Sequence, residues 1–379
     1  MRRRTFTPRP HWRAQCEELG FTFHSIDGTY WDESVAYEFS LEQIETLEAA
    51  SEDLHQRCLE AVDWVIRHQH FAPFALPPGA RELIVASWRR QEPSLYGRFD
   101  FSWDGTGAPK LLEYNADTPT GLLEASVVQW FWLQDVLPAA DQFNSLHEKL
   151  VDRWRQLDPG APVHFAALAG HEEDTGNALY LLDTAHQAGL ATDYLPIERI
   201  GFDAARRAFV DEGGRPIRHC FKLYPWEWLL QDEFGAHVGA SDIRFLEPAW
   251  KLLLSCKALL PILWQLFPAH PNLLPASFRD DLPRPKVRKP LYSREGENIR
   301  ILTADTTLAS DGPHEQAPCI WQAYAPLPNF AGSYPVLGCW MVGDSAAGLG
   351  IREDDGPITR NSSRFVPHFF YDRAATAPR

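Results

Sequence analysis

The spacing of apolar positions divides the chain into helical and strand-like stretches. Residues 1–92 are mostly of the helical kind: Ser40 is a good N-cap for a helix that begins at Leu41, and apolar side chains then recur every three or four positions as far as Ile66. We expect Asp53–His70 to be one amphipathic helix. Between residues 94 and 116 the period changes to two, with an Asp104-Gly105 turn signal, which predicts a β-hairpin.

After this hairpin the helical spacing returns over residues 122–137, and a strand–helix–strand rhythm follows. The strands are expected at Val163–Leu168 and Thr192–Pro196, on either side of a helix at 174–189, which is the pattern of a βαβ unit. We therefore place an α/β lobe at 160–250. Trp250–Phe267 is predicted to be helical, and the short, Pro-punctuated strands beyond it indicate an antiparallel lobe.

Composition and charge narrow the functional classes. The 379 residues carry a formal charge of −15, which disfavours binding to a nucleic acid backbone. Only seven of the 36 basic residues are Lys, so each lysine is an uncommon choice. The six Cys are scattered without zinc-ligand spacing, no export signal follows the N-terminal arginines, and no stretch is apolar enough to span a bilayer. We expect a cytoplasmic protein with reduced thiols that associates with neither membrane nor nucleic acid.

The predicted hairpin carries its polar side chains on one face. If Trp103 pairs with Ala108, Arg98 lies opposite Glu113 and Asp100 lies opposite Leu111. The oxygen atoms of Asp100, Glu113 and Asn115 could then converge on one or two hard cations, and ligands without His or Cys suit Mg²⁺. A simpler interpretation is a solvated hairpin face whose Arg98–Glu113 pair contributes little.

The segment after the hairpin favours the metal site over the solvated face. Thr118 is a suitable N-cap and Pro119 suits a first helical position, so we expect a helix to begin here, beside the carboxylates. The free N–H groups and positive dipole end of a helix bind anions. Cation ligands beside an anion site fit a metal-bound phosphate or a substrate carboxylate.

Several blocks in sequence order resemble the glutathionylspermidine synthase family, most closely its stand-alone acid–amine ligase branch. They are Arg98-Phe99-Asp100, Leu112–Asp117, Phe221–Glu227, Leu246–Lys251, Lys257–Pro261, Lys289-Pro290 and Gly350–Asp354. The resemblance implies a mixed α+β and α/β fold with an ATP-grasp core in permuted order. In this arrangement residues 1–92 form a helical region packed on the core, 93–159 the metal-binding hairpin and helix, 160–250 an α/β substrate lobe like a pre-ATP-grasp domain, and 251–379 the nucleotide-binding lobe.

The resemblance also implies a reaction and roles for single residues. The reaction joins a carboxylic acid to an amine through an acyl phosphate, while ATP is cleaved to ADP and phosphate. Asp100, Glu113 and Asn115 match Mg²⁺ ligands, for two ions. Arg98 and Arg352 match catalytic arginines. Arg98 also belongs to the ATP-binding set, with Lys257, Lys289, Gln322, Ala323 and Tyr324. Thr118, Glu173 and Asp174 match contacts to the acid and the amine.

Two other functions remain open from the residues. An acidic, Trp-rich chain with paired carboxylates is also typical of carbohydrate hydrolases, although such an enzyme has no use for Lys257 and Lys289. A second alternative is a family member that binds ATP or a polyamine without ligating. The sequence does not identify the acid or the amine, and a peptide-like acid with a polyamine-like amine is the pairing that the family resemblance implies.

Overall fold

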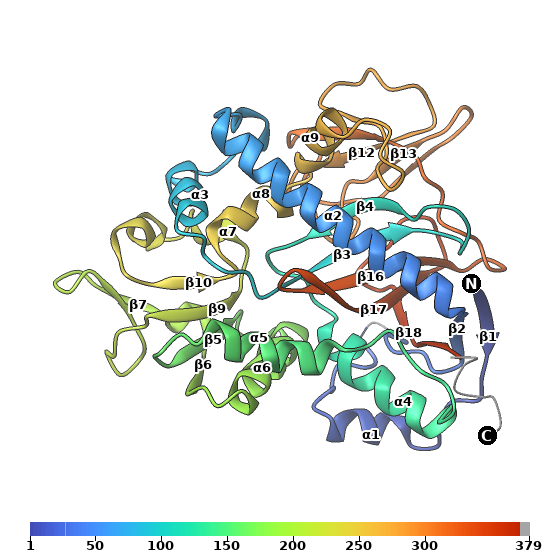
Figure 1. Ribbon diagram of the computed structural model, residues 1–379, viewed down its shortest axis with the longest axis horizontal. Helices are drawn as coiled ribbons and strands as arrows, with labels where there is room; N and C mark the ends of the chain where they lie inside the picture. Colours follow the sequence, from blue (N-terminus) through green and yellow to red (C-terminus); the bar gives the residue numbers. More distant parts are fainter. Residues whose placement is uncertain (27, 372–379) are drawn as a thin grey trace.

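The computed structural model describes residues 1–26 and 28–371, and a five-stranded antiparallel sheet lies at its centre (Figure 1). Its strand order is β18-β17-β16-β3-β4. The hairpin predicted from the sequence forms one edge of this sheet, and two long strands from the C-terminal part of the chain continue it. The strands are β3 (Tyr96–Ser102), β4 (Lys110–Asn115), β16 (Tyr334–Val342), β17 (Ser345–Asp354) and β18 (Arg364–Val366).

The register within the β3–β4 hairpin differs from the prediction. Asp100 pairs with Glu113 and Arg98 pairs with Asn115, with a bulge between Asp100 and Phe101. The predicted pairing of Arg98 with Glu113 and of Asp100 with Leu111 is therefore wrong. Near the turn the pairing is shifted by one residue, since Ser102 pairs with Lys110, and the bulge adds a second. The Trp103 indole N–H stabilises the loop by donating to the carbonyls of Thr106 and Gly107. The polar side chains still share one face, because beyond the bulge the error is two residues and the pleat repeats every two.

A second antiparallel sheet is formed mostly by the C-terminal third of the chain, in the order β11-β15-β12-β13-β14. It confirms the short antiparallel strands expected beyond residue 267, and it lies beside α9 in Figure 1. Its strands are β11 (Ala276–Ser277), β12 (Lys286–Pro290), β13 (Arg300–Leu302), β14 (Thr307–Ala309) and β15 (Cys319–Ala323).

The βαβ prediction is confirmed by a four-stranded parallel sheet, ordered β10-β9-β5-β6. Helix α6 (Glu172–Gln187) connects β5 (Val163–Ala167) to β6 (Thr192–Pro196), and α5 (Leu146–Leu157) packs beside it. The carboxyl ends of β5 and β9 point in the same direction, toward the central sheet. The remaining strands are β9 (His219–Leu223), β10 (Arg244–Leu246), the pair β7 (Gly201–Asp203) and β8 (Ala208–Val210), and the three-stranded sheet of β1 (Arg2–Thr5), β2 (Val35–Phe39) and β19 (His368–Phe370).

Helix α2 (Leu41–Arg67) crosses the central sheet and begins as predicted. The Ser40 hydroxyl accepts from the Gln43 N–H while the Gln43 side chain accepts from the Ser40 N–H, which completes a capping box. The amphipathic stretch expected at 53–70 is the second half of this longer helix, which ends at Arg67 and not at His70. The other helical segments are α1 (Trp12–Glu18), a 3₁₀ turn at Ala72–Phe74, α3 (Ala80–Arg89), a π-helical turn at Glu124–Val128, α4 (Gln129–Val136), 3₁₀ turns at Ile197–Arg199, Gly235–Ala240 and Ala249–Lys251, α7 (Trp226–Leu229), α8 (Leu252–Ser255) and α9 (Leu259–Leu266).

The continuous helix predicted over Trp250–Phe267 is wrong, because the segment breaks between α8 and α9 and bends by 80°. Pro261 accounts for part of this break. Proline lacks an N–H and is tolerated without cost only in the first turn of a helix, and α9 begins at Leu259. The break places Lys257 in a short connection. Within the described residues no single helix has the length and apolar character of a membrane span. The bent pair Ala249–Ser255 and Leu259–Leu266 has that length and apolar character only when its two helices are taken together.

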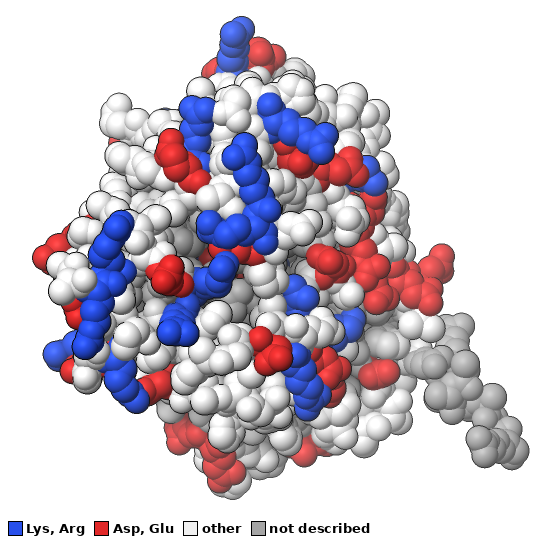
Figure 2. All heavy atoms as spheres, turned by 60° about the vertical axis from the view of Figure 1, so that its left-hand side comes forward, with Lys and Arg blue, Asp and Glu red and all other residues white. Residues whose placement is uncertain are grey.

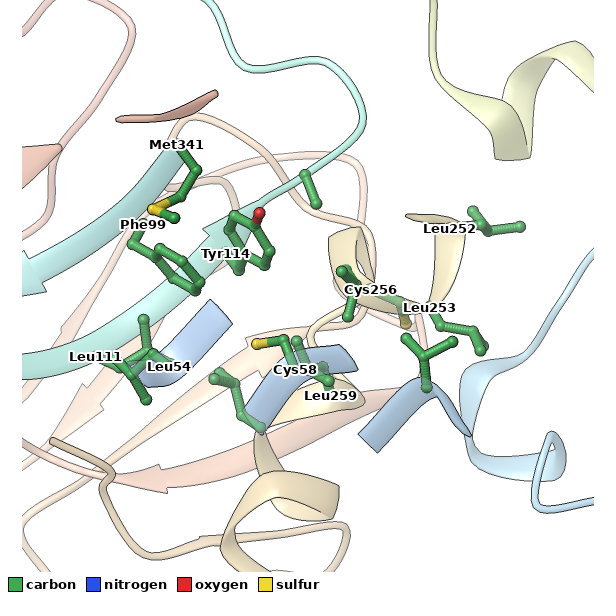
Figure 3. Close-up of a cluster of buried hydrophobic side chains, with 14 of the residues drawn as sticks. Leu54, Cys58, Phe99, Leu111, Tyr114, Leu252, Leu253, Cys256, Leu259 and Met341 are labelled. Carbon is green, nitrogen blue, oxygen red and sulfur yellow. The ribbon is translucent and has the colours of Figure 1, made fainter. Parts of the chain in front are cut away.

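The hydrophobic core beneath the hairpin is shown in Figure 3. Phe99 and Tyr114 stack with ring centres 3.8 Å apart, and Leu54 and Cys58 of α2 approach them together with Leu259 of α9. All five side chains are almost entirely buried. Burial of this face of the hairpin anchors β3 and β4, and it leaves the opposite, polar face turned toward the interior cavity described next.

Candidate active site

One cavity of about 740 Å³ lies where the three larger sheets meet. The polar face of the central sheet, strands β12 and β15 of the second sheet, and the carboxyl ends of β5 and β9 form its walls. Every candidate residue named from the sequence lines this cavity, namely Arg98, Asp100, Glu113, Asn115, Thr118, Glu173, Asp174, Lys257, Lys289, Gln322, Ala323, Tyr324 and Arg352.

The hairpin residues form one hydrogen-bonded cluster. The Asn115 amide donates to Asp100 Oδ2 at 2.9 Å and to Glu113 Oε1 at 3.2 Å. Arg98 makes a bidentate contact with Asp100, from Nε at 2.7 Å and from Nη2 at 3.0 Å. Burial raises the pKa of the Asp100 carboxyl despite this arginine. The donor set of two carboxylates and one amide side chain fits a hard cation.

Two lysines from separate elements reach this cluster. Lys257, in the break between α8 and α9, places Nζ 3.0 Å from Glu113 Oε2 and donates to the Ser293 carbonyl at 2.6 Å. Lys289 of β12 donates to the Leu112 carbonyl at 2.8 Å. Burial alone would raise the pKa of Glu113, but the two ammonium groups outweigh it and lower the value to about 2. Burial also lowers the pKa of Lys289 to about 8, against the opposing pull of Glu113.

The far end of the cavity is apolar and borders β15. Val287, Ile301 and Leu327 line it beside Gln322, whose side chain donates to the Leu111 carbonyl at 3.1 Å. The predicted strand over 320–324 is present as β15, which ends at Ala323. The N–H groups of Ala323 and Tyr324 donate to the carbonyls of Pro275 and Pro285, so in this structure they are not available to a bound base.

Arg352 projects from β17 at another wall. Its Nη2 donates to the carbonyls of Arg360 and Asn361, each at 2.8 Å, and its guanidinium lies 5.0 Å from the centre of the Phe365 ring. The Nε atom is buried without a hydrogen-bond partner among the described residues. The side chain is thus fixed in place with one donor left over.

The predicted role of Thr118 as a helix N-cap is wrong. Helical structure begins only at Leu122, after Gly121, whose φ of +85° turns the chain. A Cβ at Gly121 would lie 2.3 Å from the Phe365 ring, so the close approach also requires glycine. Thr118–Thr120 instead form an extended loop along the cavity, and the Thr120 carbonyl accepts from Arg98 Nη1 at 2.6 Å. The anion site expected at a helix start beside the carboxylates is therefore replaced by this loop.

Acidic side chains gather at another part of the cavity lining, which we call the acidic end. Glu173 and Asp174, in the first turn of α6, lie there with Glu172 and with Glu295 from the β12–β13 loop. Burial, reinforced by Glu173, raises the pKa of Asp174 to about 6. This end of the cavity is suited to a cationic group.

Sequence reasoning missed several residues around the site. One is Glu295, in the β12–β13 loop, which belongs to the cavity lining. Glu124 is fully buried behind the cavity, where it accepts from the Tyr30 hydroxyl, and no pattern marks it in an otherwise apolar helical stretch. Burial and the nearby Glu173 raise the pKa of Glu124 to about 8. The low number of lysines could have drawn attention to Lys222, which pairs with Asp117 at 2.7 Å.

Comparisons with known proteins identify the family of this chain. The family model described as "Glutathionylspermidine synthase preATP-grasp" matches residues 3–371. A Haemophilus influenzae protein named "Putative acid--amine ligase" is 42% identical, over 96% of this chain and 98% of that protein. Trypanothione synthetase from Crithidia fasciculata is 30% identical over 93% of the chain, and the bifunctional glutathionylspermidine synthetase/amidase of Escherichia coli is 28% identical over 84%.

The chain spans a little over half the length of these last two relatives, at 57% and 56%. Among solved structures, a glutathione synthetase-like effector from Globodera pallida superposes with a TM-score of 0.56 at 11% identity, covering 95% of this chain and 96% of the effector. At that identity the likeness shows the mixed α/β fold alone. By the family match and the near full-length relative, the chain belongs to the glutathionylspermidine synthase family, and it is a ligase of the class that forms carbon–nitrogen bonds.

Proposed function

We propose that this protein is an ATP- and Mg²⁺-dependent ligase that joins a carboxylic acid to an amine through an acyl phosphate, with an ATP-grasp core in permuted order. One observation carries the proposal. Two buried lysines from the second sheet and the α8–α9 break meet a carboxylate–amide cluster from the central sheet inside a single cavity. Phosphoryl transfer depends mostly on such positioning and charge neutralisation.

The hairpin cluster fits the metal. Carboxylate oxygens of Asp100 and Glu113 would hold it together with the amide oxygen of Asn115, for two Mg²⁺ ions. When bound there, Mg²⁺ would supply positive charge to neutralise the phosphates. The raised pKa of Asp100 supports this assignment, because a buried carboxylate of this kind gains from an added cation.

The remaining residues divide between the nucleotide and the two substrates. Lys257 and Lys289 would bind the phosphates of ATP, and the apolar wall around Gln322, Ala323 and Tyr324 would hold its base. Arg98, held beside the cluster by Asp100 and the Thr120 carbonyl, would stabilise the transferred phosphoryl group, with Arg352 nearby as a second cation. The acid's carboxylate oxygen takes the γ-phosphoryl group and ADP leaves. The amine nitrogen then attacks the acyl carbon, phosphate leaves, and the amine loses a proton.

The substrates are small molecules by this proposal. Thr118 would contact the acid, and the acidic end of the cavity, with Glu173 and Asp174, would hold the amine. The names of the relatives point to glutathione-like peptides as acids and to spermidine-like polyamines as amines. A cytoplasmic location belongs to the same proposal.

A coupled ADP-release screen tests the function. Acids are crossed with amines, glutathione with spermidine included, and any product is identified by mass. We expect acid-dependent ADP release and thermal stabilisation by Mg-ATP, with turnover abolished in Asp100→Ala and Glu113→Ala but retained in Asp152→Ala, a matched change at an exposed aspartate. No thermal shift at millimolar Mg-ATP would contradict the proposal.

The same screen separates the alternatives. Retained Mg-ATP binding without acid-dependent ADP release across the panel would favour a non-ligating binding protein. The geometry disfavours a carbohydrate hydrolase, because Lys257 lies against Glu113, which lowers its pKa and removes it as a proton donor. Unchanged activity in Lys289→Ala would instead support the carbohydrate hydrolase.

A further inference from the structure

A buried ion pair between Asp117 and Lys222 joins two walls of the cavity. Lys222 Nζ lies 2.7 Å from Asp117 Oδ1 and also donates to the Tyr224 carbonyl at 2.9 Å. The second carboxylate oxygen of Asp117 accepts from the Trp226 N–H at 2.9 Å, and the ammonium lies 4.7 Å from the centre of the Trp226 ring. The two side chains are 1% and 0% exposed, so each depends on the other for its charge.

Neither residue lines the cavity, but the segments next to both do. Thr118, Pro119 and Thr120 follow Asp117 along one wall. Leu223 and Pro225 follow Lys222 along the facing wall, at the carboxyl end of β9. The ion pair therefore ties the loop after the metal-binding strand to the edge of the parallel sheet.

Stability alone is a weak reason for such a pair. Desolvation of two buried charges offsets much of their attraction, and well-packed apolar replacements of buried pairs are often neutral or stabilising. An apolar pair could not form directional hydrogen bonds. Each oxygen of Asp117 accepts a hydrogen bond from a different atom of the facing wall, Lys222 Nζ and Trp226 N. This geometry fixes the separation and the relative orientation of the two walls.

We propose that Asp117 and Lys222 are positioning residues for the acid substrate. They hold Thr118–Thr120 so that the acid's carboxylate meets the phosphoryl group beside Arg98, which donates to the Thr120 carbonyl. The inference rests on the proposed function. It assigns the pair to acid binding and not to nucleotide binding, because the proposed phosphate ligands Lys257 and Lys289 come from the α8–α9 break and β12.

The test uses Asp117→Asn, Lys222→Met and the double variant of the full chain. Asp117→Asn keeps an oxygen for the Trp226 N–H but loses the charge. The double variant removes both charges, so neither charged group is left buried without its partner in the folded protein. We expect the KM for the acid to rise roughly tenfold or more in all three, because Thr118, the proposed contact to the acid, would lose its fixed position and with it binding energy. The Kd for Mg-ATP should stay within about twofold of the wild type.

Lys251→Met is the matched control, since Lys251 forms the other fully buried lysine pair, with Glu247 at 2.9 Å, away from the cavity lining. It should lower thermal stability without raising the KM for the acid. An unchanged KM for the acid in the double variant, or an equal rise in the Kd for Mg-ATP, overturns the inference. The wild-type reaction is read first: absence of acid-dependent ADP release overturns the proposed function itself, and this inference falls with it.

Discussion

At the residue scale, the ammonium group of Lys289 should make the affinity of the site for Mg-ATP depend on pH. Its pKa is lowered to about 8 by burial, so the free protein loses this charge as pH rises through 8. Phosphate binding needs the protonated form. We expect the affinity for Mg-ATP to be full below pH 8 and to weaken progressively above it, as measured by titration calorimetry from pH 7 to pH 9.

Two variants test whether Lys289 is the group that causes this pH dependence. Lys289→Met should bind Mg-ATP more weakly at pH 7 and lose the fall in affinity between pH 7 and pH 9. Lys110→Met, a change at a half-buried lysine outside the cavity lining, should keep the wild-type profile. An affinity that stays pH-dependent in Lys289→Met would assign the titration to another group.

Glu124 gives a separate prediction about stability. Its pKa in the folded protein is about 8, against an ordinary value of 4.5, because the carboxyl is buried and lies near Glu173. Between these two pH values the folded state binds more protons than the unfolded state, so this group makes the free energy of unfolding fall as pH rises. Glu124→Gln keeps an acceptor for the Tyr30 hydroxyl and should remove that fall.

Thermal denaturation at a series of pH values checks this. The Tm of Glu124→Gln should exceed that of the wild type at pH 8, and the difference should shrink toward pH 5. Glu148→Gln, at an exposed position, should follow the wild type throughout. A difference that does not change with pH would contradict the raised pKa.

The lysines show which parts of the site could be predicted from single residues of the sequence and which could not. Their scarcity drew attention to Lys257 and Lys289, and both lie in the cavity. Lys222, Lys251 and Lys286 are equally buried, yet only the structure reveals their acidic partners. Asp117 lies 105 residues from Lys222, and no local pattern reports a contact made across two sheets.

At the element scale, strand β16 supports the site through Gly338. This residue pairs with Asp100 on β3, and a Cβ added to it would lie 2.8 Å from Arg98 Cδ. Arg98 has little freedom to move away, because Asp100 and the Thr120 carbonyl hold its guanidinium. Gly338→Ala should therefore displace Arg98 and reduce kcat by roughly ten- to a hundredfold, with the Kd for Mg-ATP nearly unchanged.

Steady-state kinetics of acid-dependent ADP release test this, with Gly201→Ala as the control. Gly201 also lies in a strand, and the nearest atom to its added Cβ is a flexible valine methyl at 3.4 Å. An equal loss of activity in the two variants would show a general effect of adding a methyl group and not a displacement of Arg98.

Elements were predictable where the pattern was local. The capping box at Ser40, the βαβ unit and the hairpin strands follow from the spacing within each element. The hairpin register was wrong because a bulge between Asp100 and Phe101 leaves no mark in the alternation. The other errors arose where distant contacts decide the outcome: Gly121 packs against Phe365 and delays the helix start, and the α8–α9 break lets Lys257 reach Glu113.

At the scale of the whole molecule, the net charge of −15 is distributed unevenly. Lys and Arg lie among Asp and Glu on the face shown in Figure 2, so the outer surface there is mixed in sign. Inside the cavity Glu172, Glu173, Asp174 and Glu295 all belong to the lining, and the charges of Arg294 and Arg352 act on Glu295 there. The sequence total indicated an acidic protein, but only the fold shows where that charge acts.

The acidic side chains of the cavity predict how salt affects the amine. The acidic end should attract an amine in proportion to its charge, and dissolved salt should screen that attraction, since the Debye length falls from about 30 Å at 0.01 M to about 3 Å at 1 M. With saturating Mg-ATP and acid, kcat/KM for a polyamine should fall with ionic strength more steeply than kcat/KM for a monoamine of similar length. Glu172→Gln, at an exposed position, should reduce the difference between the two slopes. Parallel slopes for the two amines would show that the acidic end does not face the amine during turnover.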